Sequence, residues 1–423
     1  MTSPLRGSLA VPGDKSISHR ALILAALAVG ASRIEGLNDG SDVASTRAAL
    51  AAMGARIETR ADGAIAVHGV GVGGLTEPEA PFDCGNSGTS ARLLIGLCAS
   101  HPIRAGFTGD ASLVRRPMDR IAAPLRRIGA RISADRLPLT VEGLYPAVPT
   151  RHRLEIPSAQ VKSALLLAGL NTPGITEIVE TVPTRDHLAR MLRLFGAELA
   201  SDGTRLALRG EAELRPQRVT IPGDASAAAF LAVAALIVPG SAIRIAGVGA
   251  NPMRTGLYDT LREMGGDVAF VNAREISNEP VADLVVRHSA LAGVDVPAEI
   301  APRMIDEYPI LFIAAAFARG TTRARGLAEL RLKESDRIAA MAAGLAAVGV
   351  RAEAEGDSLA IPGSGGAPLA GGAIIDPRLD HRIAMSFAVA GLHCVEPIGV
   401  AGMKVTETSF PGFEAALAAA RAA

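Results

Sequence analysis

An internal repeat restricts the fold of this chain more than any other feature of its sequence. The stretch VPGDKSISHRALILAALAVG at residue 11 has the same plan as IPGDASAAAFLAVAALIVPG at residue 221: a polar turn, an apolar helical run and a glycine. Four further stretches share this plan: CGNSGTSARLL at 84, IPSAQVKSALL at 156, RMIDEYPILFI at 303 and LDHRIAMSFAV at 379. Because self-similarity of this kind marks repeated structural modules, we expect six similar units.

A second, amphipathic helical segment and short alternating strands follow each apolar run. In five units the amphipathic segment ends at a glycine suited to the C-terminal end of a helix: Gly54, Gly129, Gly196, Gly265 and Gly349. Stretches such as AIAVHGV and TRLALRG then alternate as half-buried strands do. The sixth unit reaches the end of the sequence before its closing strands. We therefore expect the N-terminal GSLAVP to complete it.

This order predicts an α/β protein with two domains of three units each. One domain would comprise residues 14–221, and the other residues 1–13 plus 222–423. The chain would cross between them near Gly13 and Gly223, where PGD recurs, which makes both glycines candidate hinges. A solenoid is the alternative for any repeat, but solenoid repeats usually have about 20 to 50 residues and these are longer.

Composition excludes several classes of partner. Lys+Arg and Asp+Glu number 43 each, so no net charge would attract nucleic acid or an anionic membrane. The three cysteines lack the spacing of a disulfide framework or a metal site, which favours a cytoplasmic protein without metal. No apolar stretch reaches the roughly 18 residues that span a bilayer. ALILAALAVGAS resembles the core of an export signal, but the same kind of segment recurs throughout the chain.

Polar residues gather where each apolar helix is predicted to begin. Helix N-termini attract phosphate and carboxylate groups through unpaired N–H groups and the helix dipole. If all six starts face one cleft between the domains, they form a strong anion site. Helix capping alone is the alternative, and we favour it for Asp224, Ser226 and Thr89. The starts offer Lys15, Ser16 and Arg20; Asn86, Gly88 and Thr89; Ser158, Gln160 and Lys162; Asp224 and Ser226; Asp306 and Glu307; His381 and Arg382.

Seven motifs together resemble the EPSP synthase family of 3-phosphoshikimate 1-carboxyvinyltransferases. They are GDKSISHR, GNSGT, RRPM, SAQVKSA, DEYP, KESDR and DHRIAM, which occur in the family's order and rough spacing between about residues 7 and 413. The resemblance implies an inside-out α/β barrel fold: two domains of three βαβαββ units, with the active site in the interdomain cleft. It also implies a monomer without a cofactor. The reaction implied is transfer of the enolpyruvyl group of phosphoenolpyruvate to the 5-hydroxyl of shikimate 3-phosphate, in aromatic amino acid biosynthesis.

The resemblance also implies site residues, motif by motif. Contacts to shikimate 3-phosphate are expected from Lys15, Ser16, Arg20, Ser158, Ala159, Gln160, Arg185, Asp306 and Lys333. Contacts to phosphoenolpyruvate are expected from Lys15, Asn86, Gly88, Arg116, Gln160, Arg337, Arg382 and Lys404. Asp306 is the candidate base for the 5-hydroxyl. Glu334 and Lys15 are candidates for the other proton transfers, and the sequence does not divide those roles between them.

Three positions depart from the pattern of many family members. Where a Ser-x-x-Tyr pattern is common, this chain reads TVPTRDH, so the sugar contact is expected to pass to Arg185. Ala159 stands where some members have a second serine. Gly88 stands where a glyphosate-resistant branch has alanine, so we expect inhibition by glyphosate. His19 and Cys84 receive no role.

Two other functions are possible. A transferase that places enolpyruvate on UDP-N-acetylglucosamine typically has an early Lys-Asn pair and a reactive Cys or Asp in a mobile loop. Here the early pair is Lys-Ser, and the loop GDASLVRRPMDR has no cysteine. A non-catalytic, anion-binding paralogue is less expected because the candidate catalytic residues are all retained. Measured turnover would distinguish this paralogue from an enzyme.

Overall fold

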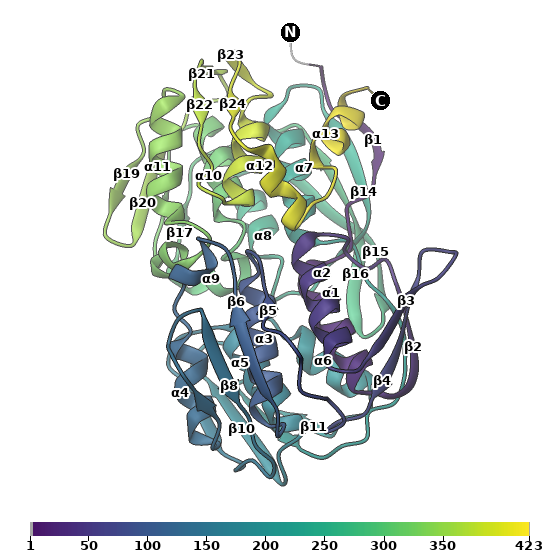
Figure 1. Ribbon diagram of the computed structural model, residues 1–423. Helices are drawn as coiled ribbons and strands as arrows, with labels where there is room; N and C mark the ends of the chain where they lie inside the picture. Colours follow the sequence, from purple (N-terminus) through teal and green to yellow (C-terminus); the bar gives the residue numbers. More distant parts are fainter. Residues whose placement is uncertain (1–2, 423) are drawn as a thin grey trace. The chain divides into compact units, whose positions relative to one another are not determined.

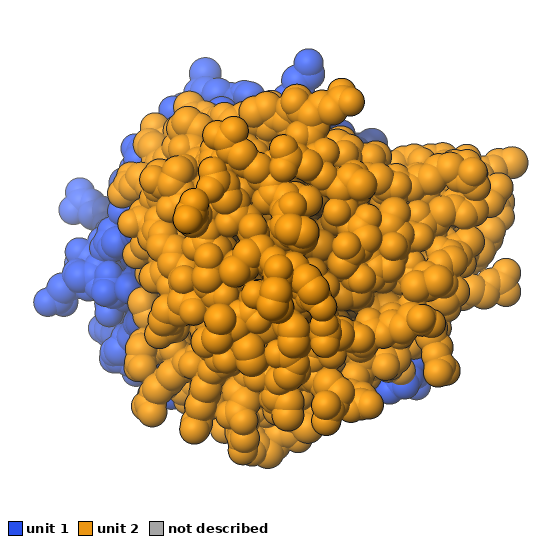
Figure 2. Space-filling view, turned by 60° about the horizontal axis from the view of Figure 1, so that its bottom comes forward, with its two compact units in different colours: residues 1–12, 222–275, 280–423 blue, residues 13–221, 276–279 orange. Residues whose placement is uncertain are grey.

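The computed structural model describes residues 3–422, which form two compact units (Figure 1). Unit 1 comprises the chain up to Pro12, residues 222–275 and the chain from residue 280 onward; unit 2 comprises residues 13–221 and 276–279. Figure 2 shows the two units in different colours. The expected division differs from these units at two places. Gly13 and residues 276–279 both lie in unit 2.

Hydrogen bonds explain both differences. The carbonyl oxygen of Gly13 accepts a hydrogen bond from Asn38 Nδ2 at 2.9 Å, which ties this glycine to unit 2. Residues 276–279 form the turn of a β-hairpin. There the backbone carbonyl of Asn278 accepts from Arg190 Nη1 at 3.1 Å, and Ser277 Oγ accepts from the Thr220 N–H at 3.0 Å.

Unit 2 contains three repeats, each with two helices and a four-stranded sheet of its own. The sheets have the strand orders β13-β2-β4-β3, β5-β6-β8-β7 and β11-β12-β10-β9. The elements are α1 (Lys15–Leu27), β2 (Val29–Glu35), α2 (Ser41–Ala52), β3 (Arg56–Thr59), β4 (Ile65–Val70), β5 (Phe82–Asp83), α3 (Gly88–Ala99), β6 (Arg104–Thr108), the 3-10 helix η1 (Leu113–Arg115), α4 (Asp119–Arg127), β7 (Arg131–Ile132), β8 (Leu139–Glu142), β9 (Arg151–Leu154), α5 (Ala159–Leu170), β10 (Ile175–Glu180), α6 (His187–Leu194), β11 (Leu199–Ser201), β12 (Arg205–Arg209) and β13 (Arg218–Thr220).

Unit 1 repeats this plan twice and ends with a reduced third copy. Its four-stranded sheets have the orders β1-β14-β16-β15 and β17-β18-β20-β19, and the third copy has the two-stranded parallel sheets β21-β23 and β22-β24. The elements are β1 (Arg6–Leu9), α7 (Ala225–Ile237), β14 (Ala242–Gly249), α8 (Gly256–Glu263), β15 (Asp267–Ile276), β16 (Glu279–Arg287), β17 (Asp295–Val296), η2 (Ala298–Ile300), α9 (Ala301–Met304), α10 (Tyr308–Phe317), β18 (Thr321–Ala324), η3 (Ala328–Leu332), α11 (Arg337–Ala347), β19 (Glu353–Glu355), β20 (Ser358–Pro362), β21 (Leu369–Gly371), β22 (Ile374–Ile375), α12 (His381–Ala390), β23 (Cys394–Glu396), β24 (Gly399–Val400), η4 (Met403–Thr408) and α13 (Phe413–Ala422).

The sequence led us to expect that the N-terminal strand completes the sixth repeat. This expectation is wrong. β1 instead pairs in parallel with β14, in the sheet of the fourth repeat. β13, which directly precedes α7, pairs in parallel with β2 in the sheet of the first repeat. The two strands that precede PGD have thus exchanged sheets. Each crossing between units therefore runs from a paired strand into a buried helix, so backbone hydrogen bonds secure both crossings.

The first helix of each repeat is buried on nearly all sides. Every residue of α7 is buried, as are all ten residues of α10, which agrees with helices that have no polar face. Each unit has its own continuous hydrophobic core. In unit 2, α3 and α5 pack so closely that a Cβ on Gly96 would lie 2.4 Å from the Ala164 carbonyl oxygen. Only glycine leaves room for this approach.

Capping accounts for many of the polar residues at these helix starts. The side chains of Asp14, Ser87, Ser158, Asp224 and Asp380 accept hydrogen bonds from backbone N–H groups in the first turn of their helices. The predicted capping role of Asp224 is confirmed. Thr89 and Ser226 are not the caps, because each lies inside its helix, two residues after the capping residue.

Candidate active site

The start of α1 brings a lysine against a carboxylate. Lys15 Nζ lies 2.9 Å from Asp42 Oδ2, and the two side chains are only 13% and 8% exposed. Ser16 follows it at the first turn and is partly buried. A salt bridge that is largely shielded from water thus holds the ammonium group at the N-terminal end of α1. The sequence predicted an anion contact at this helix end.

Arg20 is fixed in place by two hydrogen bonds. Its Nη1 donates to the Ser16 carbonyl oxygen and its Nη2 donates to Ser163 Oγ on α5, both at 2.8 Å. Arg20 is 4% exposed. Because these partners belong to the first and third repeats, the guanidinium connects α1 with α5.

A second arginine lies close to the start of α3. Arg116 Nη2 donates to Asn86 Oδ1 at 3.0 Å and to Ser112 Oγ at 3.3 Å. Asn86 in turn donates through Nδ2 to Asp110 Oδ2 at 2.7 Å. The predicted residues Asn86 and Arg116 are therefore direct neighbours, although thirty positions separate them in the sequence.

Arg92 belongs to the same cluster, although the sequence did not single it out. Its Nη1 donates to Gln160 Oε1 at 2.8 Å, and Gln160 Nε2 donates to Thr89 Oγ1 at 3.0 Å. A Cβ on Gly88 would lie 2.7 Å from Arg92 Nη1 and 2.9 Å from Arg116 Nη1. Gly88 thus provides the space that the two guanidinium groups occupy. Arg92 lies one helical turn after Gly88, and this spacing is the only sequence pattern that points to it.

The remaining predicted residues of unit 2 lie at two places. Ser158 caps α5, and Ala159 is the first residue of that helix. Arg185 is partly buried in the segment between β10 and α6.

Three carboxylates surround Arg337 in unit 1. Arg337 Nε donates to Asp380 Oδ2 at 2.8 Å and Nη2 donates to Glu334 Oε2 at 2.5 Å. Nη1 lies 3.4 Å from Asp306 Oδ1, and Arg337 is 0% exposed. Burial alone would lower the pKa of Arg337, but the negative charges of Asp380 and Glu334 raise it, so the group stays protonated. In this conformation the hydrogen bonds of Arg337 go to protein carboxylates.

Asp306 also accepts from a second cation. Lys333 Nζ lies 3.2 Å from Asp306 Oδ1, the oxygen that Arg337 approaches as well. The side chain of Asp306 is 16% exposed and that of Glu334 is 15% exposed, so both retain access to solvent. The two carboxylates proposed for proton transfer are thus held by one shared, buried arginine.

Asp306 and its neighbour Glu307 also contact a buried polar network. Arg382 Nη1 donates to the Asp306 carbonyl oxygen at 2.9 Å and lies 3.8 Å from Glu307 Oε1. Ser226 Oγ donates to Glu307 Oε1 and accepts from Arg254 Nη2 at 2.6 Å. Arg382 is 8% exposed. Lys404 lies on η4 and is exposed.

His19 and Cys84 are buried, and burial favours the uncharged form of both side chains. Burial lowers the pKa of His19 well below its ordinary value, and its Nδ1 lies 2.8 Å from Thr46 Oγ1. Burial raises the pKa of Cys84 to about 12, so the thiol stays protonated at neutral pH. Both residues are therefore explained by packing.

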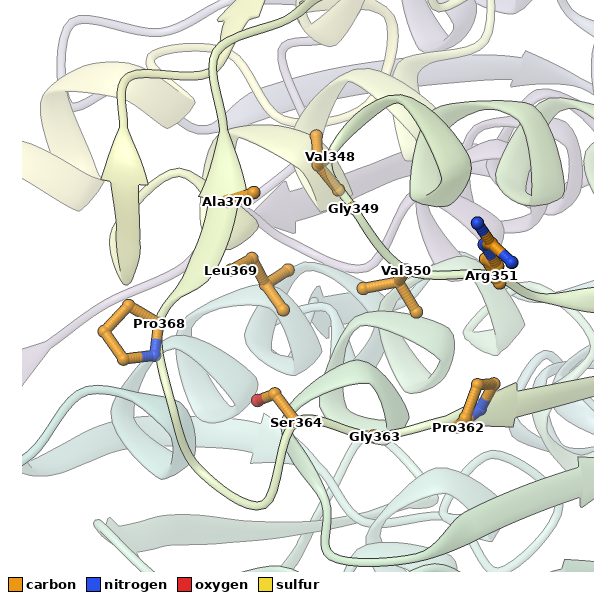
Figure 3. Close-up of a pocket in the computed structure, with 10 residues that line it drawn as sticks. All are labelled: Val348, Gly349, Val350, Arg351, Pro362, Gly363, Ser364, Pro368, Leu369 and Ala370. Atoms are coloured by element: carbon orange, nitrogen blue, oxygen red, sulfur yellow. The ribbon is translucent and has the colours of Figure 1, made fainter.

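A pocket of about 370 Å³ lies in unit 1, near the end of α11 and between β20 and β21 (Figure 3). None of the predicted site residues lines it. Its lining residues are Val348, Gly349, Val350, Arg351, Pro362, Gly363, Ser364, Pro368, Leu369 and Ala370. Between residues 3 and 422, no helix combines the length and apolar character needed to cross a membrane. No cluster of three or more His, Cys, Asp or Glu in the described part of the chain is arranged to hold a metal ion.

The chain is similar to known proteins along almost its whole length. A family model described as EPSP synthase (3-phosphoshikimate 1-carboxyvinyltransferase) matches residues 1–417. A relative from Sphingopyxis alaskensis named 3-phosphoshikimate 1-carboxyvinyltransferase is 59% identical, with 98% of this chain and 96% of the relative covered. A relative of the same name from Novosphingobium aromaticivorans is 56% identical, with 99% and 97% covered.

Solved structures agree with this match. EPSP synthase from Acinetobacter baumannii has a TM-score of 0.87 at 42% identity and covers 99% of this chain and 96% of its own. The enolpyruvyl transferase NikO from Streptomyces tendae has a TM-score of 0.79 at 19% identity, which is a likeness of fold alone. The predicted α/β fold of enolpyruvyl transferases is confirmed. The chain belongs to the EPSP synthase family.

Proposed function

We propose that this protein transfers the enolpyruvyl group of phosphoenolpyruvate to the 5-hydroxyl of shikimate 3-phosphate, with release of phosphate. The observation that carries the proposal is the match over residues 1–417 to a family whose relatives are named for this activity. The same match favours this reaction over transfer to UDP-N-acetylglucosamine and over a non-catalytic paralogue. Action as a cytoplasmic monomer stays a prediction.

The cations of both units suit substrates that carry two phosphates and two carboxylates. Arginine forks bind such groups through paired hydrogen bonds, and lysine provides a compact positive charge. We assign the shikimate 3-phosphate contacts to Lys15, Ser16, Arg20, Ser158, the backbone of Ala159, Gln160, Arg185, Asp306 and Lys333. We assign the phosphoenolpyruvate contacts to Lys15, Asn86, Gly88, Arg116, Gln160, Arg337, Arg382 and Lys404.

The reaction then proceeds by addition and elimination. In the addition, Asp306 accepts the proton of the 5-hydroxyl while that oxygen bonds to C2 of phosphoenolpyruvate, and the methylene carbon gains a proton. In the elimination, the bond from C2 to the phosphate oxygen breaks and the methyl group returns a proton, which restores the double bond. Glu334 and Lys15 are the candidates to give and take the carbon-bound proton.

Release of phosphate from phosphoenolpyruvate tests this function. We expect release only when shikimate 3-phosphate is present. The matched arm replaces this acceptor with UDP-N-acetylglucosamine, and release in that arm alone would assign the protein to the other transferase activity. Absence of release with either acceptor, together with retained binding of phosphoenolpyruvate, would identify a non-catalytic paralogue.

A further inference from the structure

We propose that Lys162 and Glu180 are positioning residues that hold Arg185 for the anionic acceptor substrate. The inference rests on the proposed function, in which Arg185 contacts shikimate 3-phosphate. Lys162 lies on α5 and Glu180 is the last residue of β10, and their side chains meet at Thr184, the residue directly before Arg185.

Four hydrogen bonds form this anchor. Lys162 Nζ donates to Glu180 Oε2 and to the Thr184 carbonyl oxygen, both at 2.9 Å. Glu180 Oε1 accepts from the Thr184 N–H at 3.1 Å and from Thr184 Oγ1 at 2.5 Å. The backbone N–H, the carbonyl and the hydroxyl of Thr184 therefore all bond to this one ion pair. Such contacts fix the position from which the next side chain extends.

Burial makes a purely stabilising role a poor explanation. The side chains of Lys162 and Glu180 are each 4% exposed, so both charges have been removed from water. Desolvation of a buried ion pair often costs as much as the pair's attraction returns, and apolar side chains of similar size frequently stabilise a protein as well or better. The other hydrogen bonds of this ion pair go to Thr184. The pair is therefore better explained by the geometry that it imposes on Thr184.

The chain after Arg185 is anchored as well. Asp186 Oδ2 accepts from Arg190 Nε at 2.7 Å, and His187 Nδ1 lies 2.8 Å from Glu279 Oε1 in a buried pair. Arg185 thus lies between fixed neighbours on both sides. By contrast, residues 181–183 are exposed.

The same turn of α5 holds a second cation assigned to the acceptor substrate. Ser163, the neighbour of Lys162, accepts the hydrogen bond from Arg20 Nη2 at 2.8 Å. Consecutive residues of one helix therefore set the side chain of Arg20 and the backbone next to Arg185. A buried helix does not need a lysine at position 162. Its place in this arrangement gives Lys162, the lysine of SAQVKSA, a positioning function.

The test compares the double variant Lys162→Met/Glu180→Gln with the wild type. The double change removes both charges together, so no unpaired buried charge is left to unfold the chain. We expect the KM for shikimate 3-phosphate to rise about tenfold or more, as for loss of one charge-assisted contact, with the KM for phosphoenolpyruvate changed less than about twofold. Hydrogen–deuterium exchange in residues 181–187 should become faster.

Two further arms separate positioning from general damage. The control Arg205→Met/Glu177→Gln removes a more exposed ion pair between β10 and the neighbouring strand β12, and should leave both KM values unchanged. In an Arg185→Ala background, the Lys162/Glu180 changes should add less than about twofold to the KM for shikimate 3-phosphate, because they act through Arg185. If the double variant does not fold, Thr184→Val removes only the hydroxyl bond to Glu180. This variant should raise the KM for shikimate 3-phosphate and leave the KM for phosphoenolpyruvate unchanged.

An unchanged KM for shikimate 3-phosphate in a folded variant would overturn the proposal. An equal rise in the Arg185→Ala background would do so too, since the effect would then not pass through Arg185. If the proposed function itself is wrong, the wild type will show no phosphate release that depends on shikimate 3-phosphate. That failure appears in the wild-type arm, before any variant is compared.

Discussion

Arg337, the first residue of α11, and Asp306, in the turn between α9 and α10 of the same repeat, approach each other to 3.4 Å between Nη1 and Oδ1. The same guanidinium reaches Glu334 at 2.5 Å and Asp380, from the sixth repeat, at 2.8 Å. One fully buried cation therefore holds both carboxylates that we assign to proton transfer. It connects their positions to the packing of two repeats.

Replacing Arg337 with methionine should destabilise the protein strongly. The change leaves Asp380 buried without its cation, and breaking such a pair typically costs about 3–5 kcal/mol. Urea denaturation of the variant measures this loss. Arg331→Met is the matched control, because Arg331 forms a more exposed pair with Asp336 at the start of α11 and should cost about 1 kcal/mol or less. Equal losses in the two variants would contradict the role given to the buried cluster.

Asp306→Ala should abolish most turnover while substrate binding persists. Loss of a general base lowers rates by about 10²- to 10⁴-fold, and the cations assigned to the substrates remain in place. Stopped-time assays of phosphate release give the rate, and calorimetry gives the affinity for shikimate 3-phosphate. Turnover close to that of the wild type would remove Asp306 from the base role.

The repeat predicted the fold class because its pattern is local. Apolar helices, terminal glycines and alternating strands each follow from a short window of sequence. The exchange of β1 and β13 between sheets was missed because the strands that precede the two PGD turns are alike, and their pairing depends on partners far along the chain. No local pattern distinguishes the two choices.

The candidate site also combines contacts between residues close in the sequence with contacts between residues far apart in it. Glu334 and Arg337, three positions apart in the motif KESDR, are in direct contact. That Asp380 completes the cluster depends on the packing of α11 against a later repeat. Arg92 was missed for a similar reason, since its partner Gln160 lies in another repeat. Residues a few positions apart, such as Glu334 and Arg337, are neighbours through the local chain, whereas contacts between repeats require the structure.

Gly88→Ala should weaken inhibition by glyphosate more than it weakens the use of phosphoenolpyruvate. The wild type is expected to be inhibited. The added methyl group would lie within 3 Å of the guanidinium nitrogens of Arg92 and Arg116, so at least one of these flexible side chains must move. We expect the KM for phosphoenolpyruvate to rise a few fold and the inhibition constant for glyphosate to rise further. Steady-state assays at several inhibitor concentrations measure both, and an unchanged inhibition constant would exclude this crowding.

His152 should make the stability of the protein depend on pH. Burial, assisted by the nearby charge of Arg127, lowers the pKa of His152 to about 4, whereas an unfolded histidine titrates near 6.5. Between these values the unfolded state binds more protons, so the stabilising contribution is complete above about pH 6.5 and is lost as the pH falls toward 4.

At pH 5 this loss should reach about 2 kcal/mol in the wild type relative to pH 7.5, beyond the contributions of other groups. His152→Gln does not titrate in this range, so its free energy of unfolding should fall by about that much less over the same interval. Urea denaturation of both proteins at the two pH values gives the comparison, and each protein at pH 7.5 is its own reference. Parallel losses in the two proteins would mean that His152 is already able to accept a proton in the folded state.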